Sequence, residues 1–325
     1  MTAAQHALVD SNGMPNNYLL YHATGPVSDP AGTITCAAVP VTLPNLACGD
    51  YAVNTIQPSY QPTSSNPTKL PAQTGTTIGD RLTAAGVSWA WYSGGWSNAN
   101  GDVGAPGWTN GTGPSCSDPY SSPNPAFPYC PNKVFQFHHQ PFNYFAAYAP
   151  GTPGRAHLQD EVAFQSLVAA SADKCMLDSV SFVKPIGLEN EHPGYTSVGR
   201  GSDHVVQLLQ SIENSKCKQD TMVVVTYDEF GGQWDHVSPP GQGGTPGAHD
   251  KWGPGTRIPA LIVAPSTRGQ FAVDHTQYDT TSILATIEQR WNLAPLGPRD
   301  GAVNSLASVF GAKEAHGDNN DNSDG

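Results

Sequence analysis

Apolar residues follow two patterns along the chain, and each pattern predicts one kind of secondary structure. They recur every three to four residues, as on one face of a helix, over 156–171, 201–215 and 279–291. A shorter helix that ends at a glycine is predicted over 76–86. Runs rich in β-branched and aromatic residues predict strands over residues 87–92, 179–183, 221–227 and 258–264. This alternation predicts an α/β fold with a mostly parallel sheet, in which the last two strands, being continuously apolar, are covered on both faces.

Two long stretches lack either pattern. Residues 1–75 and 93–132 are rich in Pro, Gly, Asn, Ser and Thr, which predicts irregular loops. The last segment, 312–325, is polar and acidic and is expected to be disordered. No repeat or linker separates two folding units, so we expect a single domain over 1–311.

The six cysteines form an even set without the CxxC spacing of zinc or redox sites. They are either six buried thiols or disulfides that staple Pro-rich loops. We favour sequential disulfides, Cys36–Cys48, Cys116–Cys130 and Cys175–Cys217. Disulfides indicate a periplasmic or secreted protein, although the first residues show neither the basic nor the apolar region of a signal peptide. No apolar run reaches about 18 residues, so we expect no integral membrane segment.

The charge of the chain excludes one large class of partners. Fifteen Lys+Arg against 27 Asp+Glu give a net charge of −12, and no window holds a basic run. Nucleic-acid backbones and anionic membrane surfaces are bound through clustered cations, so neither is an expected partner. Charged residues make up only 13% of the chain, about half the usual share, which is more typical of exported than of cytosolic proteins.

Hard-cation ligands follow the predicted strand 221–227. Asp228 and Glu229 are adjacent carboxylates at the carboxyl end of this strand, the edge of an open α/β sheet at which ligands gather. A Gly-Gly turn and then Asp235 and His236 come next. This density suits a divalent metal, because carboxylates offset its charge and glycines let the chain turn around it. The alternative is that the two adjacent acids only cap or solvate a loop.

Three further groups contain histidines. His192 belongs to the segment 189–193, which follows another predicted strand at the same sheet edge, where an imidazole suits a metal or a phosphoryl group; a solvated loop is the alternative. His138 and His139 are adjacent among aromatic residues. Because neighbours on an extended chain point oppositely, we expect one to face a site and the other to pack. His275 lies just before the last predicted helix.

A resemblance narrows the chemistry. No serine-hydrolase elbow, P-loop, dinucleotide or HExxH motif occurs, which leaves hydrolysis or transfer at a metal-bound anion. Five segments resemble the bacterial phosphoesterase family that unites AcpA-type acid phosphatases with phospholipases C, within the alkaline phosphatase superfamily. In chain order they are 138–142 (HHQPF), 191–193 (EHP), 224–240 (VVTYDEFGGQWDHVSPP), 255–263 (GTRIPALIV) and 275–284 (HTQYDTTSIL).

The resemblance implies a three-layer α/β/α, alkaline-phosphatase-like fold and an exported hydrolase that acts on a phosphate ester. It implies that Asp228 and Glu229 ligate a divalent metal ion, whose identity the sequence does not determine. In members of this family the metal withdraws charge from the phosphoryl oxygens while a Ser or Thr attacks the phosphorus in line. Water then cleaves the phosphoenzyme.

The resemblance also assigns the histidines. His192 and one of His138 or His139 would contact the phosphoryl group or support its leaving oxygen, and His236 is a further catalytic candidate. Cationic imidazoles would suit operation at low pH, since they attract the anion and donate protons.

One part of the family pattern is missing. Family members carry a Glu-Asn pair after the first strand, which completes the metal site, and then the nucleophilic Ser or Thr. Neither is assignable in this chain, and Glu189-Asn190 has the dipeptide in a later loop. We therefore expect a member that lacks its N-terminal strand or strands, half of its metal ligands and its nucleophile.

Three functions stay open at this point. A metal-dependent acid phosphatase, that is a phosphomonoesterase, is favoured. A phospholipase C would need an aromatic pocket for choline or lipid, which Trp89, Trp91, Tyr92 and Trp96 would supply unless they pack in the core. A non-catalytic secreted module would bind carbohydrate through the Trp- and Asn-rich loop 89–132. Substrate identity and oligomeric state do not follow from the sequence.

Overall fold

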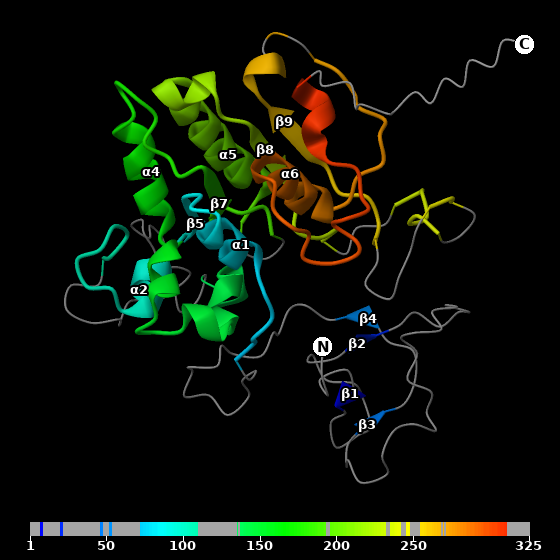
Figure 1. Ribbon diagram of the computed structural model, residues 1–325, viewed down its shortest axis with the longest axis horizontal. Helices are drawn as coiled ribbons and strands as arrows, with labels where there is room; N and C mark the ends of the chain where they lie inside the picture. The colour runs from blue at the N-terminus through cyan, green and yellow to red at the C-terminus, as the bar shows by residue number, and fades with distance from the viewer. Residues whose placement is uncertain are drawn as a thin grey trace, which may run out of the picture. The chain divides into compact units, whose positions relative to one another are not determined.

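The chain divides into two compact units in the computed structural model. Unit 1 comprises Met1–Gln73, Pro141–Ala149 and Trp234–Arg257, and unit 2 comprises Thr74–Gln140, Pro150–Gln233 and Ile258–Gly325. The structure describes residues 72–109, 135, 137–192, 196–231, 235–241, 245–247, 254–267, 269 and 271–310, with the backbone of four short strands that precede them. Figure 1 shows the labelled elements. The single domain over 1–311 stays a prediction.

Unit 1 contains two small antiparallel ladders. β1 (Ala7–Leu8) pairs with β3 (Leu46–Ala47), and β2 (Leu20–Tyr21) pairs with β4 (Ala52–Val53). The sequence showed no strand pattern there, because two-residue strands are too short to display a period. Two 3₁₀ helices follow later in the chain, η5 (Pro141–Tyr144) and η6 (Ala146–Tyr148).

Unit 2 is built around β5 (Trp89–Ser93). This strand pairs in parallel with β6 (Leu158–Gln159) on one edge and with β7 (Val180–Lys184) on the other. Ala90 and Tyr92 are fully buried in a cluster with side chains of α4 (Glu161–Ala169) and α5 (Val198–Glu213). Figure 1 shows these two helices beside the sheet. The predicted α/β fold with a parallel sheet is therefore confirmed in this part.

The alternate side chains of β5 face the other way, as the strand period of two requires. Trp89 donates its indole N–H to the Thr83 hydroxyl of α1 (Ile78–Ala84) at 2.9 Å. Trp91 stacks on Phe182 of β7, with ring centroids 5.2 Å apart. Both faces of β5 are thus covered, which explains why this strand reads as an aromatic run rather than an apolar–polar alternation.

β8 (Val223–Thr226) and β9 (Ala260–Val263) form a separate pair, in register from Val223↔Val263 to Thr226↔Ala260. Both strands were predicted, but the parallel pairing and full coverage expected of them are wrong: the pair is antiparallel, and Leu261 is 50% exposed. Parallel strands need a crossover, usually a helix, and the described part of 227–259 contains no helix. The three-layer arrangement and the missing N-terminal strand stay predictions.

Local capping sets where the helices begin. Thr77 and Asp80 form a capping box for α1, and Asp160 accepts the N–H of Val162 to cap α4. α6 (Thr281–Trp291) starts after Thr280, whose side chain makes no cap bond. α2 (Trp96–Asn100) was not predicted, because it lies in a Gly- and Asn-rich stretch that reads as a loop. No helix in the described part of the chain is long and apolar enough to cross a membrane.

One predicted disulfide lies within the described residues and is confirmed. Cys175 and Cys217 are bonded, and Cys217 is fully buried in the cluster between β5, α4 and α5. The other predicted pairs, Cys36–Cys48 and Cys116–Cys130, lie outside the described residues, as does the predicted tail 312–325.

Replacing Cys175 and Cys217 together by alanine should lower the free energy of unfolding. The loss should be about 4 kcal/mol, because the bond closes a loop with a sequence separation of 42. Denaturant titration measures this loss in the free energy of unfolding. Either single alanine variant should lose about as much as the double variant, since each breaks the same bond. A loss below about 1 kcal/mol would contradict this account.

Gly94→Ala should also destabilise the protein, by about 1–3 kcal/mol. Gly94 follows β5, and an added Cβ would lie 2.6 Å from the backbone N of Ile186. Gly75→Ala is the matched control, because nothing lies within 4 Å of its added Cβ. Thermal unfolding of the two variants should separate them; equal melting temperatures would show that the backbone at Gly94 relaxes freely.

Candidate active site

Three segments of unit 2 meet at a cluster of charged and imidazole side chains. β7 ends at Lys184, whose Nζ lies 2.8 Å from Oδ2 of Asp228, just beyond the end of β8. His138 and His139 belong to the 3₁₀ helix η4 (Phe137–His139), and the charges of both Lys184 and Asp228 act on their rings. The structure therefore brings together three residues that the sequence singled out in two separate segments, and adds Lys184.

The histidine pair is anchored to β5. Trp91 donates its indole N–H to the backbone carbonyl of His139 at 2.7 Å, and the side-chain amide of Gln140 donates to the backbone carbonyl of Trp91 at 3.3 Å. The two imidazoles meet edge to face, with centroids 4.6 Å apart. His139 is buried and His138 is partly buried. Nδ1 of His138 is buried and has no hydrogen-bond partner.

Burial controls the charge of these histidines. Desolvation, helped by the positive charge of Lys184, lowers the pKa of His138 to about 4 and lowers the pKa of His139 as well. The negative charge of Asp228 opposes this change but does not overcome it. The expectation of cationic imidazoles at low pH is therefore wrong for this pair, because the sequence does not reveal their burial beside a lysine.

Asp228 and Glu229 keep oxygens that suit a cation. Burial opposes the charged form of Asp228, but the charge and hydrogen bond of Lys184 outweigh it and lower the pKa of that carboxyl. Glu229 accepts the N–H of Gly231 at 2.6 Å through Oε2, which closes the turn after β8. Lys184 contacts Oδ2 of Asp228 and Gly231 contacts Oε2 of Glu229, while the backbone N–H of Asp228 also bonds to its own carboxylate. Two adjacent carboxylates of this kind fit the hard-ligand half of a divalent metal site.

The loop that carries His192 reaches the same region. The Tyr227 hydroxyl, at the end of β8, donates to Oε2 of Glu191, and the Ser202 hydroxyl donates to Oε1 at 2.7 Å. His192 is exposed, and its charge also acts on His138. The predicted loop thus lies at the end of β8.

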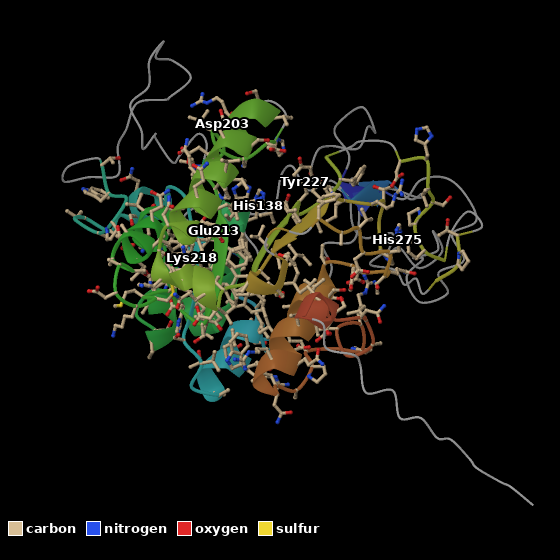
Figure 2. All side chains as sticks on the ribbon, turned by 90° about the horizontal axis from the view of Figure 1, so that it is seen from above. His138, Asp203, Glu213, Lys218, Tyr227 and His275 are labelled. Carbon is tan, nitrogen blue, oxygen red and sulfur yellow. A yellow bond between two sulfur atoms is a disulfide. The ribbon has the colours of Figure 1, made fainter. Side chains whose placement is uncertain are left out.

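Two other histidines of the sequence analysis, His236 and His275, are exposed. His236 belongs to unit 1, where its side chain is exposed and the neighbouring Asp235 is held by Arg257 at 2.7 Å. His275 is exposed, and Figure 2 shows it well separated from His138. The catalytic role of His236 stays a prediction.

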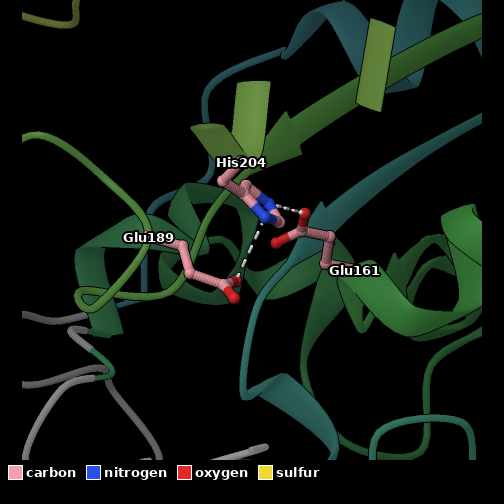
Figure 3. Close-up of side chains that lie close together, drawn as sticks. All are labelled: Glu161, Glu189 and His204. Carbon is pink, nitrogen blue, oxygen red and sulfur yellow. Dashed lines mark hydrogen bonds and ion pairs between the residues drawn. The ribbon is translucent and has the colours of Figure 1, made fainter. Parts of the chain in front are cut away.

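A second group of potential ligands lies inside unit 2. Glu161, Glu189 and His204 each offer a ligand atom within 4.8 Å of the others, so this group could hold a metal ion (Figure 3). Sequence reasoning missed Glu161 and His204, which read as an ordinary helix-start acid and a residue within a helix. It also missed Lys184, although a lysine that ends a strand beside acidic loops is a usable signal.

The comparisons agree with this chemistry. The model of the phosphoesterase family matches residues 1–294 of the 325. This chain belongs to the phosphoesterase family. The predicted resemblance is therefore confirmed. Lys184, Asp228 and the histidine pair all lie within the matched residues.

Relatives of this phosphoesterase include proteins named phospholipase C. Phospholipase C A of Mycobacterium tuberculosis is 31% identical over 162 residues, which cover 44% of this chain and 31% of that protein. Phospholipase C B of the same organism is 33% identical over 163 residues, covering 44% and 31%. Non-specific phospholipase C6 of Arabidopsis thaliana is 27% identical over 147 residues, covering 38% and 28%. The match spans about a third of the length of these relatives.

The ring protons of His138 and His139 should not shift in NMR spectra between about pH 8 and pH 5.5, since both imidazoles stay neutral there. The unfolded chain takes up protons near pH 6.5 at these positions and the folded phosphoesterase does not. Stability should therefore fall as the pH drops from about 6.5 towards 4. The His138→Asn variant lacks the ring-proton signals of His138, so a comparison with the parent spectrum assigns them. A titration of either ring near pH 6.5 would show that the pair is hydrated.

Proposed function

We propose that this phosphoesterase hydrolyses phosphate monoesters at the cluster formed by Lys184, Asp228, His138 and His139. The observation that carries the proposal is the meeting of a cation, a carboxylate and two neutral imidazoles at the carboxyl ends of β7 and β8. A phosphate monoester is a small dianion, and this combination supplies both attraction and hydrogen bonds to it. Family membership supports phosphoester chemistry in general.

Each side chain has a distinct task in this proposal. The ammonium group of Lys184 pairs with phosphoryl oxygens. The buried Nδ1 of His138 lacks a partner and, in a neutral ring, either accepts a proton from the substrate side or donates one to it. His139 holds that segment against β5 through its backbone carbonyl. His192 supplies a further imidazole from the exposed loop.

Asp228 and Glu229 are the proposed ligands of a divalent metal ion. Their adjacent carboxylates support this assignment, and an all-oxygen pair favours Mg²⁺, Mn²⁺ or Ca²⁺ over a thiolate-type zinc site. When bound, such an ion would withdraw charge from the phosphoryl oxygens. The phosphoenzyme route through a Ser or Thr belongs to the proposal by resemblance alone, and no residue of this chain is assigned as the nucleophile.

Phospholipase C activity is the second candidate, because the relatives carry that name. This activity would need a pocket lined by aromatic side chains. The burial and contacts of the four aromatic residues named for that pocket do not support one. Trp89, Tyr92 and Trp96 are buried, at 2%, 0% and 2% exposed. Trp91 donates its indole N–H to the backbone carbonyl of His139, and its ring stacks on Phe182. These side chains serve packing, which favours a small substrate bound by charge.

The third alternative, a carbohydrate-binding module, rests on the loop 89–132, of which 110–132 lies outside the described residues. Family membership favours an enzyme. Export to the periplasm or the exterior is supported by the disulfide Cys175–Cys217, since such bonds persist in oxidising compartments.

The decisive test compares two chromogenic esters, p-nitrophenyl phosphate and p-nitrophenyl phosphorylcholine, with added Mg²⁺, Mn²⁺ or Ca²⁺. We expect turnover of the monoester, and Asp228→Asn should lower kcat/KM at least about 100-fold, because it removes a proposed metal ligand and the partner of Lys184. Asp173→Asn is the matched control, since Asp173 is exposed in a turn, and its activity should equal that of the parent.

Other outcomes of this test are informative. Turnover of the phosphorylcholine ester alone would replace the monoesterase by a phospholipase C. Equal activity in the parent and Asp228→Asn would remove the cluster from the reaction.

A further inference from the structure

A buried Glu-His-Glu arrangement joins three elements of unit 2 (Figure 3). Glu161 is the first residue of α4, His204 lies within α5, and Glu189 belongs to the loop after β7. The side chains of Glu161 and His204 are 3% and 8% exposed, and that of Glu189 is 21% exposed. Three ionisable groups have therefore been taken largely out of water, which is costly unless their charges are balanced.

The neighbouring acid Asp160 has an ordinary structural role, whereas Glu161 and Glu189 do not. Asp160 accepts the N–H groups of Val162 at 3.1 Å and Ser97 at 3.0 Å, which explains its burial as a helix cap. Glu161 instead contacts His204, with Oε1 2.5 Å from Nε2. Glu189 approaches the other ring nitrogen, with Oε2 3.5 Å from Nδ1. The ion pairs that the structure gives to Glu161 and Glu189 are both with His204.

The two contacts of His204 differ in kind. The short contact joins Nε2 of His204 to Oε1 of Glu161, and in the neutral ring that a metal ion requires Nε2–H donates to Glu161. Nδ1 then presents a lone pair towards Oε2 of Glu189, a second lone-pair atom. Oε2 of Glu189 is buried and has no hydrogen-bond partner. Without a metal ion a proton takes the place between these two atoms: burial lowers the pKa of His204, but the hydrogen bond and charge of Glu161 and the charge of Glu189 outweigh it and raise that pKa.

A divalent ion fits that gap better than a proton does. Hydrogen bonds of this type are about 2.7–2.9 Å long, shorter than the observed 3.5 Å. Two ligands of one tetrahedral ion, with bonds of about 2.0–2.2 Å, lie about 3.3–3.6 Å apart. The charge agrees as well: an imidazolium offsets one of the two carboxylates and the charge of Arg200 also acts on Glu189, whereas a divalent ion at the ligand atoms offsets both carboxylates directly.

We propose that Nδ1 of His204 and Oε2 of Glu189 bind a divalent transition-metal ion, with Glu161 orienting the imidazole through Nε2. An imidazole held by a carboxylate on its other nitrogen is a common arrangement around protein-bound zinc. One nitrogen and one carboxylate oxygen favour Zn²⁺, Mn²⁺ or Fe²⁺ over Mg²⁺ and Ca²⁺. The partial exposure of Glu189 leaves room for water to complete the coordination.

The ion has a structural role that does not depend on the proposed function. It ties α5 to the loop after β7, and Glu161 connects both to the start of α4. The same loop continues to Glu191 and His192. The site is distinct from Asp228 and Glu229, so variants of the two sites separate one metal from the other.

The test measures metal content and melting temperature of the whole chain after chelator treatment and dialysis. Zn²⁺ at about 100 times its Kd should raise the melting temperature by about 4 °C. Glu189→Gln keeps the shape of the side chain and removes a ligand charge, so it should abolish the rise and bind one equivalent less zinc. Asp228→Asn is the control and should keep both the rise and that equivalent. His204→Gln should behave as Glu189→Gln does.

Three results would overturn the proposal. They are no zinc-dependent rise in the parent, an equal rise in the parent and Glu189→Gln, or loss of the rise in Asp228→Asn. Zinc held only at exposed histidines would leave the zinc content and the rise of Glu189→Gln equal to those of the parent, and so counts against the site. If His204→Gln does not fold, Glu189→Gln still decides, because it relieves the repulsion from Glu161 and should fold without metal.

Discussion

The parallel register between β5 and β7 is the constraint on which the candidate active site depends. It pairs Trp91 with Phe182 and Ser93 with Lys184, so both strands end at one edge. Trp91 holds the His138–His139 segment there, and Lys184 reaches Asp228 from the end of β8. Residues from three distant parts of the chain meet because β5 and β7 end together and their residues Trp91 and Lys184 then contact the histidine segment and Asp228.

Desolvation then decides what these groups do. The histidine pair lies deep enough that its neutral form prevails, while the charge and hydrogen bond of Lys184 outweigh burial and lower the pKa of Asp228. The result is a site with one ion pair and two neutral imidazoles, rather than a cluster of positive charge. In the proposed function such a site would bind the phosphate ester without holding excess proton charge when it is empty, and its imidazoles would transfer protons.

The interior of unit 2 shows the opposite balance. Glu161 and Glu189 outnumber the single imidazole between them, and their burial makes the excess negative charge expensive. The loop after β7 connects the two sites, because it starts beside Lys184, contributes Glu189 to the interior and then presents His192. The large aromatic residues of β5 are used for packing, which is why the proposed function assigns substrate recognition to charge and hydrogen bonding.

The sequence by itself determined the longer helices and strands of unit 2 and the family. Periodicity located α1, α4, α5 and α6, and the motif around Asp228 identified the phosphoesterase. Those signals are local, since each lies within a few residues of chain. Tertiary structure alone decided that β8 and β9 are antiparallel, that His138 and His139 are neutral, and that Lys184 and His204 matter. Strand direction, burial and charge pairing depend on residues far apart in the chain, and no local pattern records them.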